Sequence, residues 1–241
     1  MAIIILALLA SFIPSFLIFF WFRRRKSFPD YKAVCGKALV SGLLSVFPVT
    51  LASALLHITM NILLKGRVPE LVLKAFYKFI VLAFAEELVK YLTGNKYIKA
   101  NLNNVSWMDV AAFMTIVACG FNLSESVLYA VGSDVITVLV RGITALHEFY
   151  GLIMGYYLGR RMHTGNRAYM IPAFGIPFFL HGLYDYSLTP ELLAVNDNLI
   201  FLPFIAILLT WIFGIRVLLK LIRGKNDPVY TKLLLPEAAE E

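Results

Sequence analysis

Long apolar runs recur along the 241-residue chain, and charged or turn-forming residues bound each of them. A helix that spans a bilayer needs about 20 mostly apolar residues. We therefore expect seven membrane-spanning helices, at 2–22, 38–64, 74–93, 107–131, 135–158, 168–188 and 198–220. The pattern predicts an all-α, polytopic membrane helix bundle that occupies residues 1–225 as a single domain. Residues 226–241 are expected to form a carboxyl-terminal tail.

Lysine and arginine concentrate in alternate connectors between these runs. The connector 23–37 holds six of them, whereas the connectors 132–134 and 189–197 hold none. The connector 65–73 is an exception, with one lysine and one arginine. Because basic residues favour the cytoplasmic side of a membrane, we expect the amino terminus outside and the tail in the cytoplasm. This predicts a multi-pass protein of the plasma membrane.

The composition is typical of a protein immersed in lipid. Hydrophobic residues make up 60% of the chain, charged residues only 15%, and the mean hydropathy is +0.77. Soluble domains are about a quarter charged, so a soluble single-core enzyme, a coiled coil and a disordered chain are excluded. The net charge of +7 gathers at span ends, where anionic lipid explains it without nucleic acid. Cys35 and Cys119 are too few and too far apart for a disulfide framework or a thiolate metal site.

Ionisable residues lie inside the third to sixth predicted spans. A charged side chain costs about 2.5–3.5 kcal/mol at the centre of a membrane helix, so such residues usually face a polar interior and mark a functional site. The set comprises Glu86, Glu87, Lys90, Glu125, Arg141, His147, Glu148, His181 and Asp185. We therefore expect a polar cavity between these helices.

Two pairs of ionisable residues, each with members one helical turn apart, carry candidate chemistry. Glu86 and Lys90 are four residues apart and share a helix face. Lys90 can keep one carboxylate of the Glu86-Glu87 pair ionised, which leaves the other carboxylate as a general base. His181 and Asp185 have the same spacing, and Asp185 can orient His181 for metal binding or for base catalysis. Each pair taken alone is also compatible with a structural bond between helices.

Polar residues on the fourth and fifth spans also fall into pairs. Asn122 and Glu125 are three residues apart and share a face near the outer end of their helix. Arg141 and Glu148 are seven residues apart, which is about two helical turns. If residues 135–158 form one continuous helix, these two side chains lie on the same face, and we expect them to pair.

A stripe of small residues marks a packing face of the fifth span. Gly151, Gly155 and Gly159 repeat every four residues after His147. Such stripes let membrane helices approach closely, so we expect His147 to point into the bundle and away from lipid. A zincin-type helix is excluded, because a glycine and not a second histidine follows His147 by four positions.

The predicted polar faces together supply the parts of a hydrolytic centre. Two histidines and a carboxylate can hold a catalytic Zn²⁺ with one open position, and Glu125, His147 and His181 are the candidate ligands. A remaining glutamate would then take the proton of the attacking water. Without a metal, a glutamate would activate water directly while a histidine or an asparagine stabilises the oxyanion. Both chemistries suit hydrolysis of an amide bond.

The rise of a helix per residue gives the expected depth of each candidate group in the membrane. At 1.5 Å per residue, Glu86 and His147 fall near the middle of the membrane, and Glu125 and His181 fall in the outer half. These heights differ by about 10 Å. Tilt, Gly120 and the two prolines before His181 must close the gap, and the cavity would then open toward the outer leaflet.

Four motifs follow one another along residues 70–190. The first two are Glu86-Glu87-x-x-Lys90 and Gly120-Phe121-x-x-x-Glu125-x-x-x-Tyr129. The last two are Arg141…His147…Gly151…Gly155-Tyr156 and His181-Gly182-x-x-Asp185. Together they resemble the motifs of the PrsW family of intramembrane proteases, with Ser126 where that family usually has an asparagine. The family is grouped with the type II CAAX-prenyl proteases and with the APH-1 subunit of γ-secretase.

The resemblance implies a membrane-embedded endopeptidase of the glutamate or metallo type. Bacterial relatives cut a single-pass anti-sigma factor on its extracytoplasmic side, which implies a single-pass membrane protein as the substrate. Glu86 or Glu87 would act as general base, tuned by Lys90. The predicted site comprises Glu86, Glu87, Lys90, Glu125, His147, His181 and Asp185.

Two other functions would use the same buried residues. A non-catalytic scaffold, which the likeness to APH-1 allows, would use the glutamates and histidines as bonds between helices. An ion-coupled transporter would use them as an ion path, but the sequence contains no detectable inverted repeat. We place the protease above both alternatives.

Overall fold

The protein is a bundle of helices, and its computed structural model describes residues 2–25 and 27–224. Every regular element in those ranges is helical, so the predicted all-α fold class is confirmed. In chain order the elements are α1 (Ala2–Arg23), α2 (Tyr31–Leu64), α3 (Glu70–Phe76), the π-helix η1 (Tyr77–Ala83), α4 (Phe84–Ala100), α5 (Trp107–Gly132), α6 (Val135–Thr144), α7 (Leu146–Thr164), the 3-10 helix η2 (Arg167–Tyr169), α8 (Met170–Ser187), α9 (Pro190–Leu193), the 3-10 helix η3 (Asp197–Phe201) and α10 (Leu202–Arg223). The predicted tail, 226–241, lies outside the described residues.

Helices occupy all seven ranges that the sequence predicts to span the membrane. Five candidate spans in the described chain are long and apolar enough to cross a bilayer: Ile3–Arg23, Tyr31–Leu64, Trp107–Gly132, Val135–Thr164 and Asp197–Arg223. The other two ranges correspond to α3–η1–α4 and to α8, which carry most of the predicted site residues. A polytopic membrane helix bundle is therefore confirmed, while seven crossings and the orientation of the termini stay predictions.

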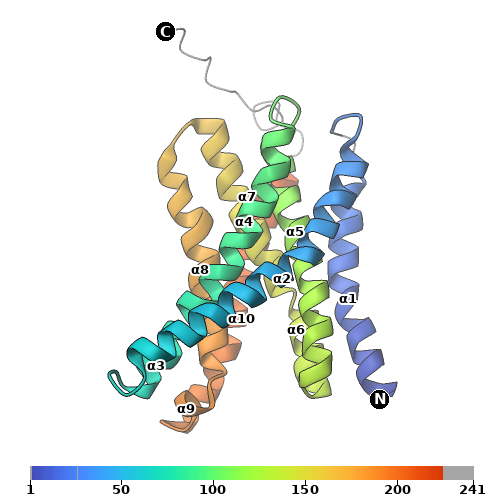
Figure 1. Cartoon of the computed structure of the whole chain (residues 1–241). Coiled ribbons are helices and arrows are strands. Elements are labelled where there is room, and N and C mark those ends of the chain that lie inside the picture. Colours follow the sequence, from blue (N-terminus) through green and yellow to red (C-terminus); the bar gives the residue numbers. More distant parts are fainter. Residues whose placement is uncertain (1, 26, 225–241) are drawn as a thin grey trace.

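The connectors fall into two groups at opposite ends of the bundle. Figure 1 shows the α1–α2, α4–α5 and α7–α8 connectors at one end, and the α2–α3, α5–α6 and α8–α9 connectors at the other. The first group is the basic one in the sequence, and the second includes the two connectors without lysine or arginine. The fold thus places the two connectors without lysine or arginine at the end opposite to the basic group, and the α2–α3 connector, with Lys65 and Arg67, is the exception to the positive-inside rule at that end.

α5 forms the centre of the bundle. Its residues 107–123 are all buried, and α1, α2, α4, α6 and α7 pack around it. A capping box closes its amino end, where Ser106 Oγ accepts from Asp109 N at 3.2 Å and Ser106 N donates to Asp109 Oδ2 at 2.8 Å. This fixed start sets the height at which α5 presents Glu125.

Glycines bring α7 into close contact with α5. A Cβ atom on Gly155 would lie only 2.6 Å from Ala111 Cα, and the other two glycines of the stripe leave similarly little room. The predicted packing stripe is confirmed, and His147 at its head is buried in the bundle. Gly120 has the same role on the opposite side of α5, where any side chain would collide with the α2 backbone.

The fifth predicted span is broken at Ala145. The sequence predicts one helix over 135–158, but α6 ends at Thr144 and α7 begins at Leu146. Ala145 has left-handed backbone angles (φ 51°, ψ 36°) and is the only non-glycine residue with a positive φ in the described ranges. This conformation costs an alanine about 1–2 kcal/mol. The prediction of a single helix is wrong because the break lies in the backbone, where the apolar pattern carries no signal.

A π-helix precedes the glutamate pair. η1 joins α3 to α4 without interruption, so residues 70–100 form one helical rod with a wider middle segment. Phe79 of this segment packs against α8 at Gly182, where any side chain would collide with the phenyl ring. This contact lies one residue after His181, so it holds His181 beside the start of α4.

We expect Gly155→Ala to destabilise the bundle, because the added methyl group meets the α5 backbone and not a movable side chain. Overpacking of this kind costs about 1–3 kcal/mol, and each kcal/mol lowers Tm by about 2–4 °C in a chain of this size. Thermal unfolding in detergent micelles, followed by circular dichroism, measures the effect. Gly175→Ala on α8 is the matched control, because nothing lies within 4 Å of its Cβ position. Equal Tm values for the two variants would contradict close packing at Gly155.

Candidate active site

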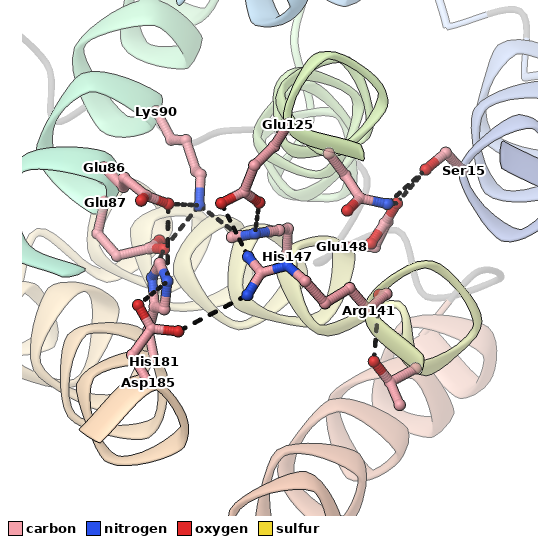
Figure 2. A network of polar contacts seen from close by, with 12 residues as sticks. Ser15, Glu86, Glu87, Lys90, Glu125, Arg141, His147, Glu148, His181 and Asp185 are labelled. Carbon is pink, nitrogen blue, oxygen red and sulfur yellow. Dashed lines mark hydrogen bonds and ion pairs between the residues drawn. The ribbon is translucent and has the colours of Figure 1, made fainter. Parts of the chain in front are cut away.

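Ionisable side chains from five helices meet at one centre (Figure 2). α4 supplies Glu86, Glu87 and Lys90, α5 supplies Glu125, α6 supplies Arg141, α7 supplies His147, and α8 supplies His181 and Asp185. Seven of them are buried, and Arg141 is nearly so, with a side chain that is 11% exposed like that of Glu125. The fold therefore brings the seven predicted site residues together and closes the height difference that the linear helix rise implies.

Lys90 and Glu87 form the innermost ion pair of this centre. Lys90 Nζ lies 2.8 Å from Glu87 Oε1 and 3.8 Å from Glu86 Oε2. The ammonium also lies 4.4 Å from the ring centroid of Phe121, within the range of a cation–π contact. An unpaired charge at this depth would be strongly destabilising, so these contacts are what allows α4 to carry three charges into the bundle.

The partners of His147 indicate where its proton lies. Lys90 Nζ, which can only donate, lies 2.8 Å from His147 Nδ1. Nδ1 must therefore accept, and Nε2 carries the proton and donates it to Glu125 Oε2 at 2.5 Å. His147 is thus held as a neutral imidazole between an ammonium and a carboxylate.

His181 has one nitrogen bound and one nitrogen free. Its Nδ1 donates to Glu87 Oε1 at 2.9 Å, which leaves the lone pair on Nε2. Nε2 faces Glu86 Oε2 at 3.6 Å and Asp185 Oδ2 at 3.8 Å. Neither Nε2 nor Glu86 Oε2 has a hydrogen-bond partner among the described residues, although both atoms are buried. Both atoms are therefore available to bind a ligand that lies between them.

Three of the donor atoms are close enough together to hold a metal ion. One ligand atom each from Glu86, His147 and His181 lie within 4.8 Å of one another, and this is the one such group in the described part of the chain. Each imidazole is bonded through its other nitrogen to a carboxylate, an arrangement that commonly orients zinc-binding histidines. Lys90 Nζ contacts His147 Nδ1 in this structure, so an ion bound through that atom would replace the ammonium.

The group differs in one member from the ligands expected on the sequence. Glu86 lies among the potential ligands, where the sequence suggests Glu125. Glu125 instead contacts His147 Nε2 on the far side of the ring and thereby orients it. The spacing of residues along single helices gives no sign of this exchange, because it depends on how α4, α5 and α7 face one another.

Arg141 does not pair with Glu148. Arg141 Nη2 donates to Glu125 Oε1 at 2.8 Å, and its Nη1 lies 3.9 Å from Asp185 Oδ1. The expected pairing fails because Ala145 interrupts the helix, so seven residues no longer correspond to two turns of one face. Arg141 thereby joins the centre, whereas the sequence-based prediction gave it only a structural role as the partner of Glu148.

Glu148 belongs to a second buried polar cluster between α1, α5 and α7. Its Oε1 accepts hydrogen bonds from Ser15 Oγ of α1 and from Asn122 Nδ2, the latter at 3.0 Å. Asn122 therefore turns toward Glu148 and not toward Glu125, with which it was expected to share a face. Two adjacent residues of α7 therefore belong to different polar clusters: His147 belongs to the candidate site, and Glu148 belongs to the second cluster.

A small cavity lies beside the two imidazoles. Its volume is about 10 Å³, room for about one water molecule. Its walls are formed by Arg141, Leu146, His147, Tyr150, His181 and Tyr184. Tyr150 stacks on His181 with ring centroids 5.2 Å apart. Tyr150 has no role in the sequence-based prediction, although its position three residues after His147 on the same helix was a signal for one.

Residues 32–212 match the protein family described as PrsW family intramembrane metalloprotease. Proteins named Protease PrsW are among the relatives. The one from Halalkalibacterium halodurans is 31% identical over 180 residues, which cover 71% of this chain and 77% of the relative. The one from Bacillus subtilis is 29% identical over 147 residues, which cover 58% and 65%.

The match is shorter for other relatives. The Protease PrsW of Geobacillus kaustophilus is 30% identical over 114 residues, and these cover 46% of this chain and 51% of the relative. The aligned region thus spans less than two thirds of the length of several curated relatives. No solved structure gives a significant match.

We expect Lys90→Met to lower stability sharply, because it leaves Glu87 buried without its cation. Removing one partner of a buried pair costs about 3–5 kcal/mol. Lys74→Met is the matched control on the same rod, since Lys74 pairs with Glu191 at 2.8 Å on the rim, where the side chains are 37% and 34% exposed. Such exposed pairs contribute about 0–1 kcal/mol.

Thermal unfolding in micelles compares the two variants. Adding Glu87→Gln to Lys90→Met should restore part of the lost stability, because it removes the stranded charge. A Lys90→Met protein that unfolds at the same temperature as Lys74→Met would disprove the anchoring role of Lys90.

Proposed function

This chain belongs to the PrsW family of intramembrane metalloproteases, and on that premise we propose that it is a membrane-embedded endopeptidase. It hydrolyses a peptide bond in a membrane-anchored protein. The observation that carries the proposal is the pair of unsatisfied buried atoms, Glu86 Oε2 and His181 Nε2, which face each other at 3.6 Å beside His147. A site that served only to join helices would have these atoms bonded.

Zn²⁺ is the proposed cofactor, and Glu86, His147 and His181 are the residues that would hold it. When bound, the ion would polarise the peptide carbonyl and lower the pKa of the attacking water. Glu87 holds His181 through Nδ1, and Glu125 holds His147 through Nε2. These two carboxylates fix the tautomer of each ring. The remaining lone pairs are on His181 Nε2, which faces Glu86 Oε2, and on His147 Nδ1, which the Lys90 ammonium contacts.

A second chemistry needs no metal, and the position of Lys90 favours it. The ammonium already supplies a positive charge beside His147 Nδ1 and Glu86. In this chemistry Glu86 takes the proton of the attacking water, because Glu86 Oε2 accepts no hydrogen bond from the described residues, whereas Glu87 Oε1 is bonded to both Lys90 and His181. The Lys90 ammonium then stabilises the developing oxyanion. Glu86 is central to both chemistries.

The proposed substrate is a single-pass membrane protein that is cut near the extracytoplasmic face. Glu125 lies seven residues before the end of α5 at Gly132, and Asp185 lies two residues before the end of α8 at Ser187. Both helices end at the face of the bundle whose connectors, 132–134 and 189–197, contain no lysine or arginine. By the positive-inside rule this is the outer face. An anti-sigma factor is the substrate class that we propose to test first.

Glu86→Gln should abolish cleavage of a co-expressed single-pass reporter, with a loss of at least about 100-fold, because general-base catalysis contributes about 10²–10⁴. Glu87→Gln should reduce cleavage through His181. Immunoblotting of the cleaved fragment measures both. Glu70→Gln is the control, since Glu70 is exposed on the same helical rod. Full cleavage by the Glu86→Gln and Glu87→Gln proteins would refute the proposal and favour a non-catalytic scaffold.

Purified wild-type protein should contain about one zinc ion per chain, and the His147→Ala and His181→Ala proteins should contain none, because each loses one of three ligands. Elemental analysis by mass spectrometry measures the metal content. His57→Ala is the control, since His57 lies exposed on α2, where it contacts Asn61 at 2.9 Å and the ring of Tyr77 and none of the candidate ligands. Active wild-type protein without metal would eliminate zinc and leave Glu86 as the base.

A further inference from the structure

Arg141 is a buried cation that neither proposed chemistry uses. Its side chain is 11% exposed, and it stands on α6, which contributes no other residue to the centre. A guanidinium in hydrocarbon costs several kcal/mol unless it is paired. Its contacts therefore indicate what the fold gains by placing it here.

The first contact joins Arg141 to the chain of bonds that ends on His147. Arg141 Nη2 donates to Glu125 Oε1 at 2.8 Å, and Glu125 Oε2 accepts from His147 Nε2 at 2.5 Å. One oxygen of Glu125 thus faces the guanidinium while the other faces the imidazole. The carboxylate cannot rotate away from His147 without breaking its bond to Arg141.

The second contact joins Arg141 to the chain of groups that ends on His181. Arg141 Nη1 lies 3.9 Å from Asp185 Oδ1, and Asp185 Oδ2 lies 3.8 Å from His181 Nε2. The distance between Arg141 and Asp185 is that of charge attraction and not of a hydrogen bond, and Asp185 lies beside His181 Nε2 without a hydrogen bond to it. Figure 2 shows the guanidinium between Glu125 and Asp185, the carboxylates that neighbour the two imidazoles. Only a forked cation can reach both at once.

The fold holds α6 so that Arg141 stays in this position. Asp134 caps the helix by accepting from Thr137 N at 3.0 Å, and at the other end Thr144 O accepts from Trp211 Nε1 of α10 at 2.9 Å. α6 also packs tightly on α1, where any side chain at Gly142 would collide with Ser11. The left-handed turn at Ala145 then lets α7 start in a new direction. Arg141 is therefore presented from a helix that is fixed at both ends.

We propose that Arg141 is the positioning residue of the centre, which holds Glu125 against His147 and Asp185 beside His181. The inference rests on the proposed function, because it assigns Arg141 to the same site. Arg141 acts through the carboxylates and is not one of the potential metal ligands. Its effect on His147 exceeds its effect on His181, since Glu125 is bonded at 2.8 Å while Asp185 lies at 3.9 Å and Glu87 already holds His181.

The test uses the full-length chain in detergent micelles and measures two quantities, the affinity for Zn²⁺ by titration and the kcat and KM for a single-pass reporter. In Arg141→Met the zinc affinity and kcat should each fall about 10–100-fold, the usual loss when the partner of a metal-binding histidine is disturbed. KM should stay within about threefold. Arg216→Met is the matched control, because Arg216 is exposed on α10, and it should leave both quantities unchanged.

Three further variants keep the test decisive. Arg141→Lys retains one charge but lacks the fork, so its losses should lie between those of the wild type and Arg141→Met. Glu125→Gln should match Arg141→Met, and the double variant should lose no more than the larger single loss, because both break the same chain of contacts. Asp185→Asn should lose less than Glu125→Gln. If Arg141→Met fails to fold, Arg141→Lys and Glu125→Gln decide the matter.

The outcomes separate this inference from the proposed function. Folded Arg141→Met and Arg141→Lys proteins that keep wild-type zinc affinity and kcat overturn the positioning role and leave the peptidase intact. A wild-type chain that binds zinc but cleaves nothing refutes the peptidase, and the zinc titrations still decide the role of Arg141. A wild-type chain that neither binds zinc nor cleaves removes both.

Discussion

The structure depends on the neutralisation of charge inside a membrane bundle. Lys90 is the clearest case, because its ammonium contacts Glu87, His147 and the face of Phe121 at a depth where water cannot solvate it. These contacts let α4 carry two adjacent carboxylates into the bundle at an acceptable free energy. They also fix the proton on His147, since a lysine can only donate. The contacts that neutralise the buried charges are therefore the same contacts that arrange the side chains of the candidate site.

Close packing turns these contacts into a defined geometry. The glycines of α7 bring its backbone onto α5, and Gly182 of α8 admits the ring of Phe79. As a result the rings of His147 and His181 lie 5.1 Å apart, although they come from different helices. Dense packing leaves a cavity of only about 10 Å³ beside them. A peptide substrate needs more room than this, so binding must be accompanied by movement of the helices around the site.

The family match begins at residue 32 and includes every residue of the candidate site, while α1 lies before it. α1 nevertheless takes part in the architecture around the site. It contacts α6 at Gly142, beside Arg141, and its Ser15 donates to Glu148, the neighbour of His147. The matched region thus contains all residues of the candidate site, and α1, which precedes it, packs against α6, the short helix that carries Arg141.

The sequence by itself determined which segments are helical and which residues are buried against their chemical preference, because both properties are local: apolar length fixes a membrane helix, and a carboxylate or imidazole within it has few places to go. It also identified the packing face of α7 from glycine spacing. Only the tertiary structure decided which faces meet. In the structure Glu86 lies beside the two histidines, and Glu125 contacts His147 Nε2 on the other side of the ring. Arg141 pairs with Glu125 and not with Glu148. These outcomes depend on the left-handed turn at Ala145, the π-helix before Glu86 and the crossing of separate helices, and periodicity along one helix contains no information about any of them.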